Sequence, residues 1–111
     1  MNIGDIVNMN FTPQSGHEMA GQHYGVVFSN SRFNDLMPLV FVAPITTKFK
    51  PQFEALRVKV ETLTPGIHGY ICLDHLKSID PNGRDFTVSI HKLTPNCKKQ
   101  CRDILKEIMN L

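Results

Sequence analysis

Two short segments of this sequence decide its fold. They are Gly16-His17-Glu18-Met19-Ala20-Gly21-Gln22-His23-Tyr24-Gly25-Val26-Val27 and Val42-Ala43-Pro44-Ile45-Thr46-Thr47-Lys48. In each segment, small and polar side chains lie directly beside an apolar, β-branched run, and such runs are typical of strands. We therefore expect two strands that carry polar residues at one end.

The length and composition indicate one small globular domain spanning residues 1–111. Hydrophobic residues make up 41% and charged residues 20% of the sequence, as is ordinary for a globular protein. A chain of 111 residues buries only a small core, and oligomerisation would add to the buried surface. The longest apolar run, residues 38–45, is far too short to span a bilayer, and the N-terminus lacks a signal-peptide pattern. We expect a cytoplasmic protein with no membrane partner.

Positive charge is concentrated in two parts of the chain, although the formal net charge is only +2. Residues 31–60 and residues 91–111 each hold five basic and two acidic side chains, whereas residues 1–30 hold no lysine or arginine. A modest basic patch of this kind suits single-stranded nucleic acid. Ordinary solvated faces explain the same charges equally well.

The three cysteines, Cys72, Cys97 and Cys101, are an odd number without a secretory signal, which favours reduced thiols. A zinc site would need a fourth ligand and usually has more closely spaced pairs. We therefore expect small buried side chains and no metal site.

Apolar and alternating runs predict strands at residues 6–11, 24–29, 39–43, 53–60, 69–73, 76–79 and 86–93. Residues 39–43 are continuously apolar, as expected of a central strand buried on both faces. Residues 30–38 are polar, and we expect them to be irregular.

A helix is predicted at the end of the chain. Thr94 supplies a capping hydroxyl and Pro95 suits the first helical position. From there one apolar stripe follows helical spacing: Cys97, Cys101, Ile104, Leu105, Ile108 and Leu111. Many short strands with one closing amphipathic helix predict a mostly β fold, a compact antiparallel barrel.

Five blocks of sequence occur in a fixed order. They are Gly4-Asp5-Ile6-Val7 with Phe11-Thr12-Pro13, the loop of residues 16–21, Val26-Val27-Phe28-Ser29-Asn30, Pro44-Ile45-Thr46-Thr47, and Asp74-His75-Leu76-Lys77-Ser78-Ile79-Asp80. In this order and spacing they resemble the MazF/PemK toxins, which are small sequence-selective endoribonucleases. The resemblance covers residues 4–80, and the C-terminal helix suits the same fold.

This resemblance implies an SH3-like barrel of the MazF/CcdB toxin type that forms a two-fold homodimer. It also implies an endoribonuclease toxin of a type II toxin–antitoxin system, which cleaves single-stranded RNA without a metal or cofactor. The implied partners are mRNA and a cognate antitoxin that covers the RNA groove, and DNA would be reached only through the antitoxin complex.

Metal-free RNA cleavage uses the 2′-hydroxyl of the substrate as the nucleophile. It needs a base, an acid for the leaving 5′-oxygen, and a group that stabilises charge on the phosphoryl oxygens. In the family, an arginine after the glycine-containing loop and a threonine at the end of a later strand provide this chemistry. By position the threonine is Thr46, and the arginine is replaced by His23.

Two interpretations of His23 follow from this replacement. Histidine lacks the permanent charge and two-pronged phosphate contact of arginine, but it titrates near neutral pH and so suits proton transfer. Either His23 performs acid–base catalysis, or the barrel is catalytically impaired and acts as a binding or regulatory module for an antitoxin or nucleic acid. A gyrase-poisoning toxin on a related barrel fits the loop and threonine blocks less well.

Further candidate residues surround this pair. Glu18 would accept a proton or orient His23, or else it is a solvated loop carboxylate. The candidates for RNA binding are His17, Tyr24 (where the family has proline), Thr47, Lys48, Lys50 and His75 (where the family often has glutamine). Phe49, between the two lysines, is placed to stack on a base, and His68 and His91 have no motif around them.

Overall fold

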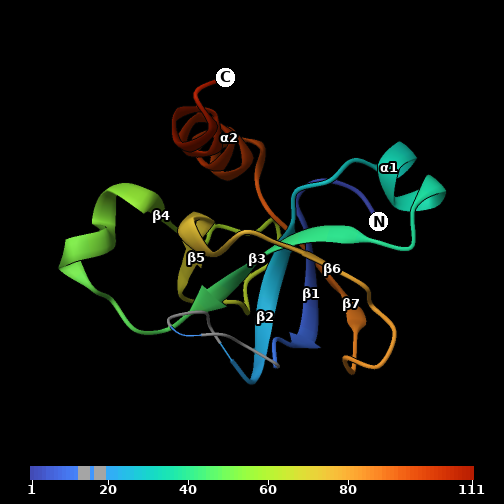
Figure 1. Cartoon of the computed structure of the whole chain (residues 1–111). Coiled ribbons are helices and arrows are strands. Elements are labelled where there is room, and N and C mark those ends of the chain that lie inside the picture. The colour runs from blue at the N-terminus through green and yellow to red at the C-terminus, as the bar shows by residue number, and fades with distance from the viewer. Residues whose placement is uncertain (13–15, 17–19) are drawn as a thin grey trace.

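The computed structural model describes residues 1–12, 16 and 20–111 (Figure 1). The strands are β1 (Asp5–Asn10), β2 (Gln22–Val27), β3 (Val40–Thr46), β4 (Arg57–Lys59), β5 (Tyr70–Cys72), β6 (Lys77–Ile79) and β7 (Thr87–Lys92). The helices are α1 (Ser31–Leu36) and α2 (Pro95–Met109), with short 3₁₀ helices η1 (Pro51–Leu56) and η2 (Leu73–His75).

The strands of the described residues form one curled antiparallel sheet in the order β4-β5-β3-β2-β1-β7. Strand β3 has two partners on the same edge, because β6 pairs with Val40–Val42 and β5 pairs with Ile45 and Thr46. Beyond β4 the chain reaches the end of β7, where Thr62 bridges Leu93. This contact brings the two ends of the sheet together, as in a barrel.

Two apolar clusters lie on opposite faces of the central strands. Val26 and Ala43 belong to the first cluster, which includes Cys97 and Cys101 of α2, whereas Val27 belongs to the second. Successive residues of a strand point to opposite faces, so a strand between two clusters must be apolar throughout. The prediction that residues 39–43 form a central strand is confirmed.

The C-terminal helix is confirmed together with its cap. The Thr94 hydroxyl accepts a hydrogen bond from the Cys97 amide at 3.2 Å, which satisfies one of the free amides of the first turn. All three cysteines are free and buried, as expected, and burial raises the pKa of Cys72 to about 11. No helix in the described part of the chain is long and apolar enough to cross a bilayer.

Two expected elements differ in the structure. Residues 30–38 are not irregular, because the Asn30 side chain accepts a hydrogen bond from Phe33 N at 2.9 Å and starts the short helix α1. Residues 53–60 are not one strand, because Pro51 starts the 3₁₀ helix η1 and only Arg57–Lys59 is extended. The guanidinium of Arg57 lies 4.7 Å from the centre of the Phe53 ring, and this contact belongs to the turn.

An ion pair lies where the first strand meets the last. Lys92 Nζ is 2.7 Å from Asp5 Oδ1, and the Asn2 amide donates to Asp5 Oδ2 at 2.9 Å. Burial alone would raise the pKa of Asp5, but the hydrogen bonds from Lys92 and Asn2 outweigh it and lower the pKa below its ordinary value. The ionised carboxylate therefore stabilises the contact between β1 and β7.

Lys92→Met should lower the free energy of unfolding by roughly 0.5–1 kcal/mol at pH 7, because Asp5 loses its cation. A carboxyl whose pKa is lowered by folding contributes stability above its unfolded pKa and loses it as the pH falls through the folded pKa. The difference between wild type and variant should therefore disappear in urea titrations well below pH 4. Lys99→Met, which removes the exposed pair with Asp103, is the control and should show a smaller effect. A destabilisation by Lys92→Met that is as large at low pH as at pH 7 would contradict the assignment.

Candidate functional site

A hollow of about 270 Å³ opens beside the ends of β2 and β3. It is lined by Asn8, Gln22, His23, Tyr24, Ile45, Thr46, Thr47, Lys48 and His68. The structure thus brings together His23, Tyr24, Thr46, Thr47 and Lys48, which the sequence placed in two separate segments.

The pairing of β2 with β3 explains why these two segments meet. Gly25 pairs with Pro44, and the same antiparallel register, continued by two residues, sets His23 opposite Thr46. Glycine at position 25 leaves room for the Val42 side chain, because a Cβ at Gly25 would lie only 2.5 Å from Cγ1 of Val42. A larger residue at Gly25 would push β2 away from β3 and separate the two candidate residues.

The imidazole of His23 is half-buried and held in one orientation. Its Nε2 lies 2.8 Å from the carbonyl oxygen of Ala20, and its ring meets Phe11 edge-on with centroids 6.2 Å apart. A carbonyl oxygen only accepts, so Nε2 carries the hydrogen of this bond. In the neutral ring the lone pair is then on Nδ1, which is the atom able to take a proton.

Thr46 is buried at the end of β3. Its Oγ1 accepts a hydrogen bond from the Lys48 amide at 3.2 Å, which leaves the hydroxyl hydrogen able to donate elsewhere. Gly69 packs against this point, because a Cβ there would lie 2.5 Å from the Thr46 carbonyl oxygen. Gly69 also has φ +132, a conformation that side chains disfavour.

Tyr24 lies on the exposed part of β2, with 41% of its surface accessible. The neighbouring polar side chains are ordered by a hydrogen bond from the Gln22 amide to the Asn8 side-chain oxygen. Amide groups at the edge of the hollow can hydrogen-bond a ligand that also contacts the tyrosine ring.

Sequence reasoning assigned no role in the site to Asn8, Gln22, Ile45 or His68, and His68 is the imidazole among them. Tyr70 pairs with Thr46, so the residues that precede Tyr70 run alongside those that follow Thr46. This antiparallel arrangement takes His68 to the Thr47–Lys48 segment. No local sequence motif predicts that His68 lies at the hollow, because its position depends on the pairing of β5 with β3.

The other predicted residues lie elsewhere. Lys50 lines an adjoining cleft, and Lys48 lines both this cleft and the hollow. His75 lies in η2, where its Nε2 is 3.5 Å from Asp74 Oδ2. His17 and Glu18 lie outside the described residues.

The side chains that line the hollow suit proton transfer and anion binding. Their polar groups are two imidazoles, three hydroxyls, two carboxamides and the Lys48 ammonium, with no carboxylate from the described residues. Across the described ranges, no group of three or more His, Cys, Asp or Glu side chains is placed to hold a metal ion. The hollow therefore offers acid–base groups next to donors for a phosphate.

Comparison with known proteins places the chain in a family. The model of the PemK-like, MazF-like toxins of type II toxin–antitoxin systems matches residues 2–109. The chain belongs to this family. The resemblance carried by the five sequence blocks is thereby confirmed, and the chain is a type II toxin of the MazF/PemK kind.

Solved structures agree with this assignment. MazF from Deinococcus radiodurans (Form-I) is 25% identical, with a TM-score of 0.88 over 100% of this chain and 97% of that chain. A MazE–MazF structure (Form-II) from the same organism is also 25% identical, with a TM-score of 0.81 over 100% and 96% of the two chains. The predicted fold class, a mostly β barrel-like sheet of the MazF type with a C-terminal helix, is confirmed.

A more distant match shows the fold alone. It is an endoribonuclease in complex with its cognate antitoxin from a mycobacterial species, 15% identical, with a TM-score of 0.75 over 100% of this chain and 96% of that chain. None of the curated proteins matches this toxin in sequence.

Gly69→Ala should lower the free energy of unfolding by about 1–3 kcal/mol, because it combines a disfavoured φ with a backbone clash at Thr46. Gly83→Ala is the matched control, since Gly83 has φ +76 but open space around it. Urea unfolding of both variants separates the clash from the conformational strain. Equal losses would show that the packing of Gly69 against Thr46 contributes nothing.

Proposed function

We propose that this toxin is an endoribonuclease that cleaves single-stranded mRNA through the 2′-hydroxyl of the substrate, without a metal ion. The observation that carries the proposal is that His23 and Thr46 line one hollow in a chain of the MazF/PemK family. The MazF/PemK toxins are known as endoribonucleases, and only RNA supplies the internal nucleophile.

In this mechanism His23 takes the proton of the 2′-hydroxyl on Nδ1, while its Nε2 hydrogen stays bound to Ala20. The 2′-oxygen attacks the adjacent phosphorus and the bond to the 5′-oxygen breaks. Thr46 donates a hydrogen bond to a phosphoryl oxygen and Lys48 stabilises its negative charge. His68 is the acid that gives a proton to the leaving 5′-oxygen, and the products are a 2′,3′-cyclic phosphate and a 5′-hydroxyl.

For the remaining candidates we propose the roles expected from the sequence. Glu18 accepts a proton or orients His23, and His17, Tyr24, Thr47, Lys50 and His75 contact the RNA. We further propose a cytoplasmic location, where mRNA is found.

The second candidate function for this site is binding without cleavage. The imidazole of His23 lacks the permanent charge of the family's arginine, and this difference favours a barrel that is catalytically impaired and acts as a regulatory module for an antitoxin or nucleic acid.

We propose a cognate antitoxin as the protein partner. The D. radiodurans and mycobacterial relatives were solved with MazE and with a cognate antitoxin, respectively. The basic side chains beside the hollow suit an acidic segment of such a partner, and DNA is reached only through the complex.

The cleavage test uses a long single-stranded RNA incubated with the toxin in EDTA. Wild type should give discrete fragments ending in cyclic phosphate, His23→Ala should be slower by about 10²–10⁴-fold, and Thr46→Val by about 10²-fold. His91→Ala is the control, because His91 contacts the Thr64 carbonyl instead of the hollow. If the RNA stays intact at a high concentration of wild-type protein, the nuclease proposal is refuted and the binding module is the remaining function.

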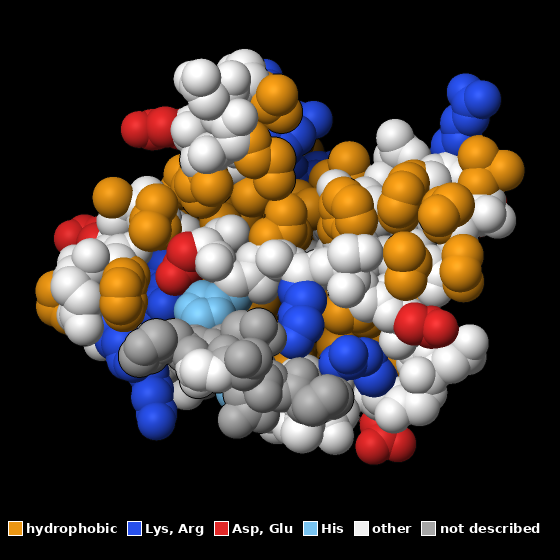
Figure 2. Space-filling view, in the orientation of Figure 1, with side chains coloured by type: hydrophobic (Ala, Val, Ile, Leu, Met, Phe, Trp, Pro, Cys, Tyr) orange, Lys and Arg blue, Asp and Glu red, His pale blue; other side chains and the backbone are white. Residues whose placement is uncertain are grey.

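We also propose that the toxin is a homodimer, as the family membership implies. Figure 2 shows apolar side chains gathered on the face between α2 and α1. A groove of about 280 Å³ runs there beside Phe28, Phe41, Leu105 and Met109. An exposed groove lined mostly by apolar side chains suits a second copy of the chain.

Met109→Lys should convert a dimer into a monomer in sedimentation velocity runs, because it places a charge on this face. Met109 is 49% exposed in the protomer, so the protomer tolerates the change. Leu63→Lys, at a residue 64% exposed elsewhere, is the control and should stay dimeric. A wild type that sediments as a monomer would refute the homodimer.

A further inference from the structure

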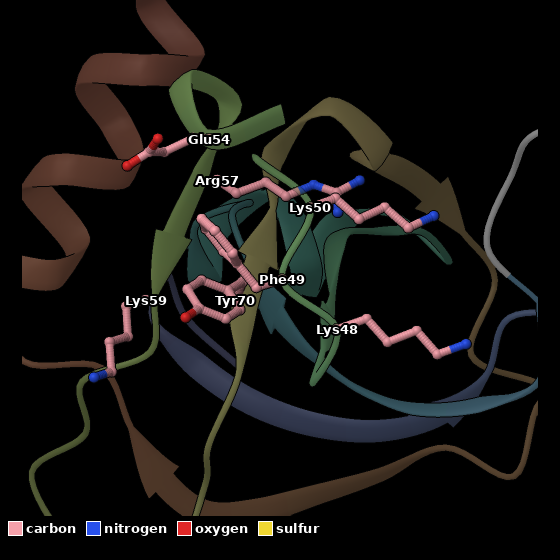
Figure 3. Close-up of a pocket in the computed structure, with 7 residues that line it drawn as sticks. All are labelled: Lys48, Phe49, Lys50, Glu54, Arg57, Lys59 and Tyr70. Carbon is pink, nitrogen blue, oxygen red and sulfur yellow. The ribbon is translucent and has the colours of Figure 1, made fainter. Parts of the chain in front are cut away.

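A second cleft lies next to the hollow and shares Lys48 with it. It encloses about 180 Å³ between the segment that follows β3, the strand β4 and the start of β5. Figure 3 shows the rings of Phe49 and Tyr70 side by side at its centre. Because one side chain belongs to both cavities, a polymer bound in the hollow can continue into this cleft.

The two aromatic rings form an open platform. Their centroids are 5.2 Å apart and their planes are tilted by 44°. Phe49 is 51% exposed, whereas most large apolar side chains of the sheet are buried. An exposed ring that contacts a second ring on one side is stabilised further when a flat aromatic partner covers its open side.

The charges around the rings favour a polyanion. Lys48, Lys50 and Lys59 have no ion-pair partner among residues 1–12, 16 and 20–111. In Figure 3, Lys48 and Lys50 extend to one side of the rings and Lys59 to the opposite side. Glu54 is the one acidic residue lining this cleft within the described chain.

Arg57 has a different role, because its charge is already satisfied. Its Nε and Nη2 both lie 3.3 Å from the Asp74 carboxylate, and its guanidinium covers the Phe53 ring. Arg57 therefore lines the cleft and holds the segment before β4 in place through Phe53. The positive charge available to a ligand comes from the lysines.

We propose that this cleft is a stacking subsite for one base of the RNA substrate, adjacent to the phosphate bound in the hollow. The base stacks on the ring of Phe49, with Tyr70 beside it, and the lysines contact the phosphates on either side of the base. This inference rests on the proposed function, since it names a contact of the same substrate. A polymer that alternates flat apolar bases with negative phosphates matches alternating rings and lysines, whereas an acidic peptide matches only the lysines.

Stacking depends on a π-face that every base has, so this subsite adds affinity and tolerates many sequences. The choice of cleavage sequence then lies with hydrogen-bonding groups in the hollow, such as Asn8 and Gln22. Lys50 and Lys59 make binding depend on salt, with each phosphate contact changing the slope of log K against log salt by about 0.7.

The test measures binding of a short, labelled, single-stranded RNA whose 2′-hydroxyls are all methylated, so that it cannot be cleaved. By fluorescence anisotropy, Phe49→Leu should bind about 10-fold more weakly than wild type, because it keeps an apolar side chain but loses the ring. Phe49→Tyr, which keeps the ring, and Ile90→Ala, at another exposed apolar residue, should bind like wild type. Circular dichroism confirms that each variant is folded.

An abasic scan of the same RNA locates the stacked base. Removing one particular base should weaken binding to wild type about 10-fold but cause no further loss with Phe49→Leu, because the two changes delete the same contact. Equal RNA affinity of Phe49→Leu and wild type would overturn the subsite, as would a Phe49→Leu defect seen only with an acidic peptide.

The subsite and the proposed function fail in different ways. RNA that binds with a Phe49-dependent base but is never cleaved when its 2′-hydroxyls are free supports the subsite and refutes the nuclease. RNA that is cleaved at the same rate by Phe49→Leu and wild type at subsaturating concentration refutes the subsite and supports the nuclease. A wild type that binds no RNA refutes both.

Discussion

The rest of the structure depends on the burial of β3 on both faces. Its residues alternate between two apolar clusters, and its backbone pairs with β2 on one edge and with β6 and then β5 on the other. Such a strand has no solvated side, so each of its backbone groups needs a partner within the sheet. The change of partner along β3 is what allows one sheet to curl into a barrel.

The candidate site lies where this change of partner occurs. Thr46 is the last residue of β3 and pairs with Tyr70, while His23 reaches the same place along β2. Gly25 and Gly69 keep the neighbouring strands close enough for this meeting. The candidate side chains His23 and Thr46 therefore stand on strands whose position is set by core packing.

Much of this arrangement was predictable, and the exceptions have physical causes. The apolar run of residues 39–43 and the cap at Thr94 are local signals strong enough to identify the central strand and α2. The alternation of residues 53–60 was misleading, because Pro51 and the contact of Phe53 with Arg57 favour a turn that periodicity does not register. His23 and Thr46 could be chosen from the family's order of sequence blocks, whereas His68 enters the hollow through long-range pairing that no local pattern encodes.

The hollow is built from segments that are far apart in the sequence, and this affects the stability of the protein. The lining of the hollow comes from β1 and β2, from the end of β3 with the residues that follow it, and from His68 in the segment between β4 and β5. A ligand that touches all of these segments binds only while they are held together, and so it favours the closed barrel over any state in which they separate. A ligand of this kind would thus protect the toxin from unfolding and proteolysis in proportion to its occupancy.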